Sequence, residues 1–298
     1  SPAADGREEL RARMLDGVPV AEERTVLAGI PTTLLEGGSG PPLVLLHGPG
    51  ESAVNWRWVL PELVADHRIV APDLPAHGRS GGEDEPLDAE RVEEWLRAVV
   101  GRAPSPPVLA GHVLGGALAA RYAAARSETL RGLVLIDALG LAGFRPSLRF
   151  LLAMLGFQAR PTERTYGWFM KQCAYDRDAL RERMGRRWKT FVSYNVQLAR
   201  SPKRKAAGRL FRALGVPRIP PEELERIDVP TALIWGRHDR ALPLRIAESA
   251  SQRHGWPLHV VEEAADDPFR DRPGAFLRTL RRILDDFARE RGRTASPA

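Results

Sequence analysis

The 298-residue sequence has a single cysteine, Cys173, and only four lysines among its 44 basic residues. One cysteine excludes an internal disulfide bond and a cysteine-rich metal site. No window approaches the roughly 18 consecutive apolar residues of a membrane span, and the N-terminal residues lack the apolar run of a secretory signal. Neither a GxGxxG fingerprint nor a P-loop is present, which argues against a nucleotide cofactor. We therefore expect a cytoplasmic protein without a membrane partner.

Basic and aromatic residues are unevenly distributed along the chain. Residues 144–215 hold 17 basic and four acidic residues and 11 of the 20 aromatic ones, although the net charge of the chain is only +6. This composition indicates a separate module. Most of its charge is expected on solvated helix faces, and no nucleic-acid-binding module is recognisable, so we expect no nucleic-acid partner. A homodimer is left open.

Short apolar runs alternate with amphipathic segments, which is typical of parallel strands covered by helices. After residue 137 helical patterns replace the alternation, which predicts an α/β core in residues 1–139 and 226–298 and a helical cap in residues 140–225. Strands are predicted at residues 25–35, 43–47, 68–72, 108–111, 132–137, 231–235 and 258–261. Core helices are predicted near residues 56–65, 89–100, 115–125, 244–254 and 273–290.

Four short motifs follow one another in the predicted core. They are LVLLHGPG at residues 43–50, VAPDLPAHGRS at 70–80, GHVLGG at 111–116 and LIWGRHDRALP at 233–243. Their order and spacing resemble the α/β-hydrolase superfamily in its capped form. The resemblance implies a mostly parallel eight-stranded sheet flanked by helices, with the nucleophile of a catalytic triad on a sharp strand-to-helix turn. Gly111, Gly115 and Gly116 supply that turn.

The resemblance places Val113 where the family carries its nucleophile. A methyl group has no lone pair and no ionisable proton, so a covalent intermediate cannot form there. Asp239 matches the carboxylate of the family's triad. In the segment VVEEAADDPFRDRPGAF the histidine position is taken by Asp266, or by Asp267 if the register shifts by one residue. The triad is therefore degenerate.

The implied oxyanion hole is altered as well. Its donors would be the N–H groups of Leu114 and of the residue at Pro49. Proline has no N–H, so a shifted loop would have to offer Gly50 or Glu51. The same pocket region includes Gly48, His47 and His112, and we expect both histidines to be structural. No histidine pair has metal-ligand spacing with supporting carboxylates, so no metal is expected.

Two carboxyl groups at neighbouring triad positions point to a different chemistry. If Asp239 and Asp266 lie close together, one pKa rises toward neutrality, and such a carboxyl moves protons without a nucleophile. We therefore predict a cofactor-independent, non-hydrolytic enzyme in which Asp266 and Asp239 carry out proton-transfer chemistry, such as intramolecular C–C bond formation by cyclisation, or elimination. Family members with a disabled triad resemble natural-product tailoring enzymes, which implies an aromatic polyketide-like substrate. The alternatives are a cofactor-free oxygenase and a catalytically silent ligand-binding protein.

Aromatic side chains of the predicted cap suit a bulky aromatic or polycyclic ligand. The candidates for contacting it are Tyr166, Trp168, Phe169, Trp188 and Tyr194. Most of these side chains are also expected to build the cap's own core. A hydrolase with a relocated nucleophile is a further alternative, with Ser52, Ser80 and Cys173 as the candidate groups.

Overall fold

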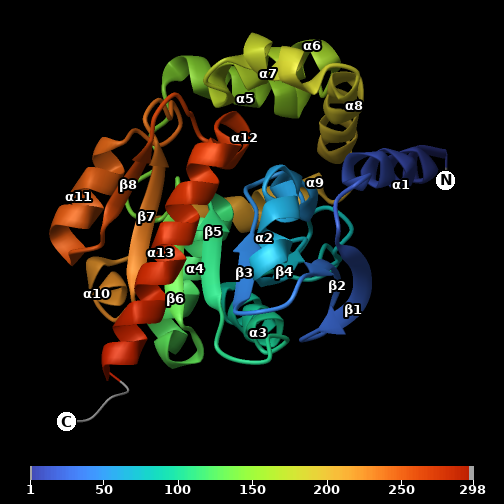
Figure 1. Cartoon of the computed structure of the whole chain (residues 1–298). Helices are drawn as coiled ribbons and strands as arrows, with labels where there is room; N and C mark the ends of the chain where they lie inside the picture. Colours follow the sequence, from blue (N-terminus) through green and yellow to red (C-terminus); the bar gives the residue numbers. More distant parts are fainter. Residues whose placement is uncertain (1, 295–298) are drawn as a thin grey trace.

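An eight-stranded sheet forms the centre of the molecule (Figure 1). The computed structural model describes residues 2–294, with side chains described for residues 6–290. The strand order is β1-β2-β4-β3-β5-β6-β7-β8, and only the β1–β2 and β2–β4 pairs are antiparallel. The strands are β1 (Ala21–Leu27), β2 (Ile30–Gly37), β3 (Pro42–Leu46), β4 (Arg68–Pro72), β5 (Val108–His112), β6 (Gly132–Ile136), β7 (Thr231–Gly236) and β8 (Leu258–Val261). The predicted mostly parallel sheet is confirmed.

The single strand predicted at residues 25–35 is wrong, because the chain turns inside that segment. β1 and β2 form a hairpin around Ala28 and Gly29, whose φ angles are 46° and 76°. Positive φ at both turn positions matches the twist of a two-residue hairpin, which usually has Asn-Gly or Asp-Gly there. An alanine in the first position hid the turn from sequence reasoning.

Helices cover both faces of the sheet, so its central strands are nearly continuous apolar runs. β3, β5 and β6 are buried along their whole length. One face packs against α3 (Ala89–Val100), α4 (Leu114–Arg126) and α11 (Arg245–His254). The other packs against η1 (Ala53–Trp58), α2 (Leu60–Asp66), α12 (Pro268–Asp271) and α13 (Pro273–Thr294). The short η2 (Ser127–Thr129) follows α4.

A group of helices lies between β6 and β7 in the chain. The cap helices of this group lie above the carboxyl ends of the strands (Figure 1). The helices are α5 (Leu148–Ala159), α6 (Glu163–Cys173), α7 (Arg177–Met184), α8 (Arg187–Ala199), α9 (Arg204–Leu210), η3 (Phe211–Gly215) and α10 (Pro221–Leu224). α5 to α8 lie beyond the sheet, whereas η3 and α10 return against α4. The domain boundaries at residues 139 and 225 stay a prediction.

An additional helix, α1 (Pro2–Leu15), packs against α8 of the cap and against η1 (Figure 1). Its Arg11 is 3% exposed, and Nη1 lies 3.0 Å from Asp73 Oδ2. The same nitrogen donates a hydrogen bond to the Tyr194 hydroxyl over 3.3 Å. α1 therefore ties the cap to the core, which no sequence pattern indicated.

Candidate active site

The turn after β5 is the pedestal on which α/β-hydrolases carry a nucleophile, and it is sterically intact. A Cβ on Gly111 would lie 2.3 Å from the Gly115 carbonyl oxygen, and one on Gly115 would lie 2.5 Å from that of Leu46. One on Gly116 would lie 2.5 Å from Ala138 Cβ. Only glycine allows strand and helix to approach so closely. The glycines predicted from the motif therefore hold the turn as expected.

Val113 stands at the tip of this turn, between β5 and α4. Its φ and ψ angles are 46° and −103°. A β-branched residue at positive φ is a backbone outlier, and such strain costs about 1–3 kcal/mol. The side chain is half-buried against the apolar cluster that contains Leu114 and Cys173. The pedestal thus keeps a strained conformation while presenting a methyl surface.

Asp266 lies in the loop after β8, and its side chain is only 14% exposed. Burial raises its pKa well above the ordinary value, and the charge of Asp267 adds to the shift while Arg270 opposes it. Its Oδ1 has no hydrogen-bond partner. The Cys173 thiol of α6 senses the charge of Asp266. Asp266 is thus a buried carboxyl whose protonated form is favoured by its surroundings.

Asp239 follows β7, and the backbone N–H groups of Ala241 and Leu242 donate to its Oδ1 over 2.7 and 2.8 Å. Burial nevertheless raises its pKa to about 7. Its carboxyl group interacts electrostatically with that of Asp137, a fully buried residue that directly follows β6. Burial, followed by the charge of Asp239, raises the pKa of Asp137 well above its usual value. The two carboxyls are therefore expected to share a proton.

Sequence reasoning missed Asp137. Its Oδ1 accepts a hydrogen bond from Gly236 N over 2.9 Å, and its Oδ2 has no partner apart from the neighbouring carboxyl. The charges of both Asp239 and Asp266 act on it. An aspartate directly after the buried run of β6 was the available signal, because strand ends of a parallel sheet meet at one edge.

Arg270 in α12 is the positive charge of this carboxyl-rich region, and it was also missed. It pairs closely with Asp267, and its Nη2 and Nε lie 3.7 Å from Asp266 Oδ1 and 3.6 Å from Asp271 Oδ1. Its Nη2 also donates to the Cys173 carbonyl oxygen over 2.9 Å. Burial works against the charge of Arg270, but the three carboxylates raise its pKa overall. Asp267, the alternative for the histidine position, therefore serves as the main counterion of Arg270.

The loop after β3 does not form the expected oxyanion hole. The Gly48 N–H donates to Glu51 Oε2 over 3.0 Å, and Pro49 has no N–H to offer. The Gly48 N–H, which directly precedes Pro49 in this loop, is therefore already bonded to the Glu51 carboxylate. Leu114 is the first residue of α4, so its N–H has no partner within the helix and stays a candidate donor.

His47 is a neutral structural residue. Burial lowers its pKa to about 3. Its Nε2 accepts from the Leu74 N–H over 2.9 Å, and its Nδ1 lies 2.8 Å from the Gly48 carbonyl oxygen, to which it donates. Both ring nitrogens are thus used to hold the loop, in agreement with the structural role expected.

The carboxylates of Glu51 and Asp267 lie near the ring of His112, which the spacing of these residues in the sequence did not indicate. Glu51, His112 and Asp267 place three potential metal ligands within 4.8 Å of one another, and no other such group occurs among the described residues. Burial opposes the charge on His112, but Glu51 and Asp267 raise its pKa overall. Arg270 pairs with Asp267, and the Gly48 N–H bonds to Glu51, so two residues of the group also belong to a network of ion pairs and hydrogen bonds, whereas His112 Nδ1 has no hydrogen-bond partner.

The predicted cap residues fall into different environments. Tyr166 is buried, and its hydroxyl senses the charges of Arg270 and Asp267. Phe169 stacks on Phe157 between α5 and α6, and Trp168 is 44% exposed. Tyr194 is bonded to Ser52 and Arg11 instead of facing Val113. Trp188 contacts Phe191 and lines a surface pocket. Of the five, Tyr166 is the one that electrostatics connects to the carboxyl region.

None of the relocated nucleophiles considered above is activated. Ser52 Oγ lies 2.7 Å from the Tyr194 hydroxyl, and Ser80 Oγ donates to the Asp73 carbonyl oxygen over 2.7 Å. Burial, with the charge of Asp266, raises the pKa of the Cys173 thiol well above its usual value. A thiol in this state is a poor nucleophile.

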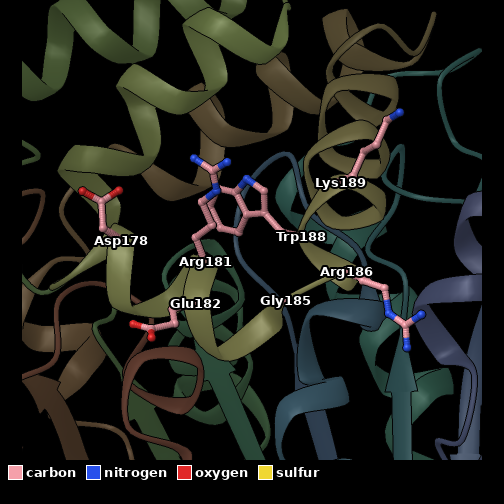
Figure 2. A pocket seen from close by; sticks show the side chains of 7 residues that line it. All are labelled: Asp178, Arg181, Glu182, Gly185, Arg186, Trp188 and Lys189. Atoms are coloured by element: carbon pink, nitrogen blue, oxygen red, sulfur yellow. The ribbon is translucent and has the colours of Figure 1, made fainter.

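Two surface cavities are lined by residues other than Val113. One, of about 480 Å³, is bounded only by cap residues, as Figure 2 shows. Its lining consists of Asp178, Arg181, Glu182, Gly185, Arg186, Trp188 and Lys189. The other, of about 330 Å³, lies between α1, the β1–β2 hairpin and α8. Neither is lined by Val113, Asp239 or Asp266.

Residues 43–279 match the family described as "Alpha/beta hydrolase family", and the chain belongs to it. It is 29% identical over 241 residues to a 2-hydroxymuconate semialdehyde hydrolase from a Pseudomonas strain, covering 76% of this chain and 80% of the relative. It is 30% identical over 244 residues to a 2-hydroxy-6-oxo-2,4-heptadienoate hydrolase of Pseudomonas putida, covering 77% and 83%. A solved 2-hydroxy-6-oxo-6-phenylhexa-2,4-dienoate hydrolase from a Rhodococcus strain has the same fold, with a TM-score of 0.79, 22% identity and coverage of 90% and 99%.

These relatives overturn the functional prediction from the sequence. The expected non-hydrolytic cyclase or lyase of a polyketide pathway is wrong, because the relatives are named hydrolases. None of them is named as an oxygenase or as a ligand-binding protein. The prediction failed because a missing nucleophile at Val113 was taken to favour non-hydrolytic chemistry, whereas it excludes only a covalent intermediate at that position. No helix in residues 2–294 has the length and apolar character that a membrane crossing requires.

Proposed function

We propose that this protein is a hydrolase of small unsaturated keto acids and that water, not a side chain, attacks the substrate. The observations that carry the proposal are an intact pedestal with Val113 at its tip and, in the loop after β8, a buried carboxyl, Asp266, at the position that the family resemblance gives to the histidine. The named relatives support hydrolysis, and the residues at the two triad positions support the non-covalent route.

The absence of an activated side-chain nucleophile favours direct addition of water. Val113 cannot form an acyl intermediate. A carboxyl with a raised pKa in a poorly hydrated site is suited to general acid–base catalysis near neutral pH. Asp266 meets this description, and its coupling to Asp239 and Asp137 gives it neighbours that can hold or release a proton.

The proposed reaction consumes one water molecule and breaks the bond between a carbonyl carbon and the adjacent carbon. Asp266 in its ionised form accepts a proton from water as the hydroxyl oxygen adds to the carbonyl carbon. The carbon–carbon bond then breaks, its electron pair stays on the leaving carbon, and that carbon takes the proton from Asp266. The hydroxyl remains on the acyl carbon as a carboxylic acid, so the carboxyl group is regenerated and no cofactor is consumed.

The substrate class follows from the relatives' names, which describe dienoates that carry an oxo group and a carboxylate. A conjugated acid of this kind is planar and apolar along its chain, which suits contacts with aromatic side chains. The aromatic composition of the cap supports the same class, because residues of α6 and α8 pack over the carboxyl ends of the strands. An aromatic or aromatic-derived small molecule is thus the proposed partner.

The proposal is tested with synthetic 2-hydroxy-6-oxo-dienoates in heavy-oxygen water. We expect one labelled oxygen in the released acid, no adduct on the protein by mass spectrometry, and a rate that rises with pH as carboxyls with raised pKa ionise. Replacing Asp266→Asn is expected to lower kcat by about 100-fold or more, since general-base catalysis contributes factors of that order.

The matched control is Asp178→Asn, an exposed aspartate of α7 that pairs with Arg177. This variant is expected to keep full activity. A covalent adduct at any side chain, or an unchanged kcat in Asp266→Asn, would contradict the water mechanism. Failure of the wild type to hydrolyse any dienoate of this class would contradict the proposed function itself.

A further inference from the structure

Arg57 lies at the last turn of η1, where the core meets the cap. The centre of its guanidinium is 3.9 Å from the ring centroid of Trp58 and 5.3 Å from that of Phe191 in α8. Most of the side chain is buried, and Nη1 is inaccessible to solvent. The guanidinium is thus held between aromatic side chains of two different segments.

Arg57 has no counterion among the side chains of residues 6–290. Nη1 has no hydrogen-bond partner, and none of the carboxylates with described side chains lies within ion-pair distance of the guanidinium. Burial lowers its pKa to about 9. Stacking on an aromatic ring offsets about 2 kcal/mol at most, and it does not satisfy the N–H donors. A buried, unpaired charge is costly enough that proteins normally provide a partner.

The two other deeply buried arginines show what is missing at Arg57. Arg11 lies 3.0 Å from Asp73 Oδ2 and pairs with Glu22 as well. Arg270 is surrounded by three aspartates. Each of these charges is neutralised by the protein itself. Arg57 is the exception, although it is packed from both sides.

The surroundings of Arg57 are positive. The charges of Arg270 and Arg187 both act against that of Arg57. Arg183 lies 5.8 Å from the Trp58 ring, so it adds a further positive group to the same junction. Several guanidinium groups around an unpaired one favour an anion over a neutral ligand.

We propose that Arg57 binds the carboxylate of a planar, unsaturated acid, with Trp58 and Phe191 flanking the conjugated chain. The planar fork of a guanidinium matches a carboxylate in two parallel hydrogen bonds. The aromatic rings suit a flat chain rather than a compact inorganic ion. The identity of the acid as a substrate rests on the proposed function, whereas anion binding rests on Arg57 alone. We refer to Arg57, Trp58 and Phe191 as the carboxylate site.

Tyr166 connects the carboxylate site with the carboxyl region. Its ring lies 6.0 Å from that of Phe191. Its hydroxyl interacts electrostatically with Arg57 on one side, and with Arg270 and Cys173 on the other. An acid anchored at Arg57 would therefore extend past Tyr166 toward the loop that carries Asp266. Arg57 thereby acts as a specificity residue that selects acids.

The experiment compares cinnamate with its neutral analogue cinnamamide by titration calorimetry, using the full chain. Wild type is expected to bind cinnamate at least about tenfold more tightly than cinnamamide, because a charge-assisted hydrogen bond contributes roughly that factor. Arg57→Met is expected to lose this preference, and Arg57→Lys to retain part of it. Arg164→Met, on the exposed side of α6, is the control and is expected to bind as wild type does.

Thermal unfolding shows whether the variants are folded, and removal of an unpaired buried charge is expected to leave Arg57→Met at least as stable as wild type. The proposal is overturned if wild type binds neither probe, if it binds both equally, or if Arg57→Met keeps the preference for cinnamate. Binding that depends on Arg57 in a protein that hydrolyses no dienoate would support the carboxylate site and refute the proposed function. Hydrolysis of a dienoate by wild type, together with unchanged binding of cinnamate by Arg57→Met, would support the proposed function and refute the carboxylate site.

Discussion

The pedestal after β5 and the loop after β8 meet at the same edge of the sheet, yet different forces hold them in place. Close backbone contacts fix the pedestal, since Cβ atoms at Gly111 and Gly115 would collide with carbonyl oxygens. Charges fix the loop after β8, where Arg270 is packed among three aspartates. The first region tolerates a change of the displayed side chain, as Val113 shows. The second depends on the balance of its charges.

Removing Arg270 is expected to have the largest effect on stability. Arg270→Met leaves Asp266, Asp267 and Asp271 buried without their common counterion, which costs about 3–5 kcal/mol for a broken buried pair. Protonation of the carboxyls relieves part of the repulsion, so the loss should be greater at about pH 8 than at about pH 5. Urea unfolding at both pH values measures it. A pH-independent loss would contradict the electrostatic origin.

Replacing a pedestal glycine is expected to be nearly as damaging. In Gly115→Ala the new Cβ would lie 2.5 Å from the Leu46 carbonyl oxygen, so β3 and α4 must move apart. We expect a loss of about 3 kcal/mol, in the range seen for steric overpacking. Gly143→Ala, where no atom lies within 4 Å, is the matched control and should change stability little. Equal effects of the two substitutions would disprove the close-contact explanation.

The pH dependence of stability is a smaller test of the carboxyl region. The folded state raises the pKa of Asp239 to about 7 and also raises those of Asp137 and Asp266. Folded protein therefore binds these protons more tightly than unfolded protein. This stabilisation is complete below about pH 4 and is lost as the pH rises through the folded pKa values. Because the pKa of Asp239 rises from 3.8 to about 7 on folding, we expect this residue alone to contribute a decrease on the order of 4 kcal/mol by about pH 8.

Chemical unfolding across this pH range measures the decrease, and other groups add their own contributions. The informative comparison is therefore between wild type and Asp239→Asn, whose amide oxygen can still accept the N–H bonds of Ala241 and Leu242. The stability of the variant should fall less steeply than that of wild type as the pH rises from about 4 to about 8. Parallel curves for both proteins would show that Asp239 titrates normally.

Restoring the side-chain nucleophile is expected to have the smallest effect. Val113→Ser supplies a hydroxyl on an intact pedestal, but Asp266 has no imidazole nitrogen to take its proton. We expect ester hydrolysis to increase by less than about tenfold, which corresponds to about 1.4 kcal/mol of transition-state stabilisation. The double substitution Val113→Ser with Asp266→His should give a larger increase. Strong esterase activity in the single variant would contradict the assignment of the histidine position to Asp266.

The fold could be predicted because its signals are local. The apolar runs of β3, β5 and β6 and the glycines of the pedestal each reflect a constraint within a few residues. The hairpin at Ala28 was missed because its turn lacks the usual residues. Helix α1 was missed because its packing against α8 is a long-range contact without an apolar period of its own.

The candidate site was only partly predictable, for the same reason. Val113, Asp239 and Asp266 stand at motif positions, so their places could be inferred from spacing. Arg270 and Asp137 gain their importance from neighbours that are distant in the sequence. The functional conclusion was wrong because a list of residues shows which route of catalysis is absent, but not which reaction remains.

The packing of α1 against α8 affects how freely the cap can move relative to the core. Two chain connections, before α5 and after α10, join these helices to β6 and β7 of the core. Arg11 adds a third connection, because its side chain binds both Asp73 of the core and Tyr194 of α8. We therefore expect that any movement of α8 away from the core requires Arg11 to release Asp73 or Tyr194.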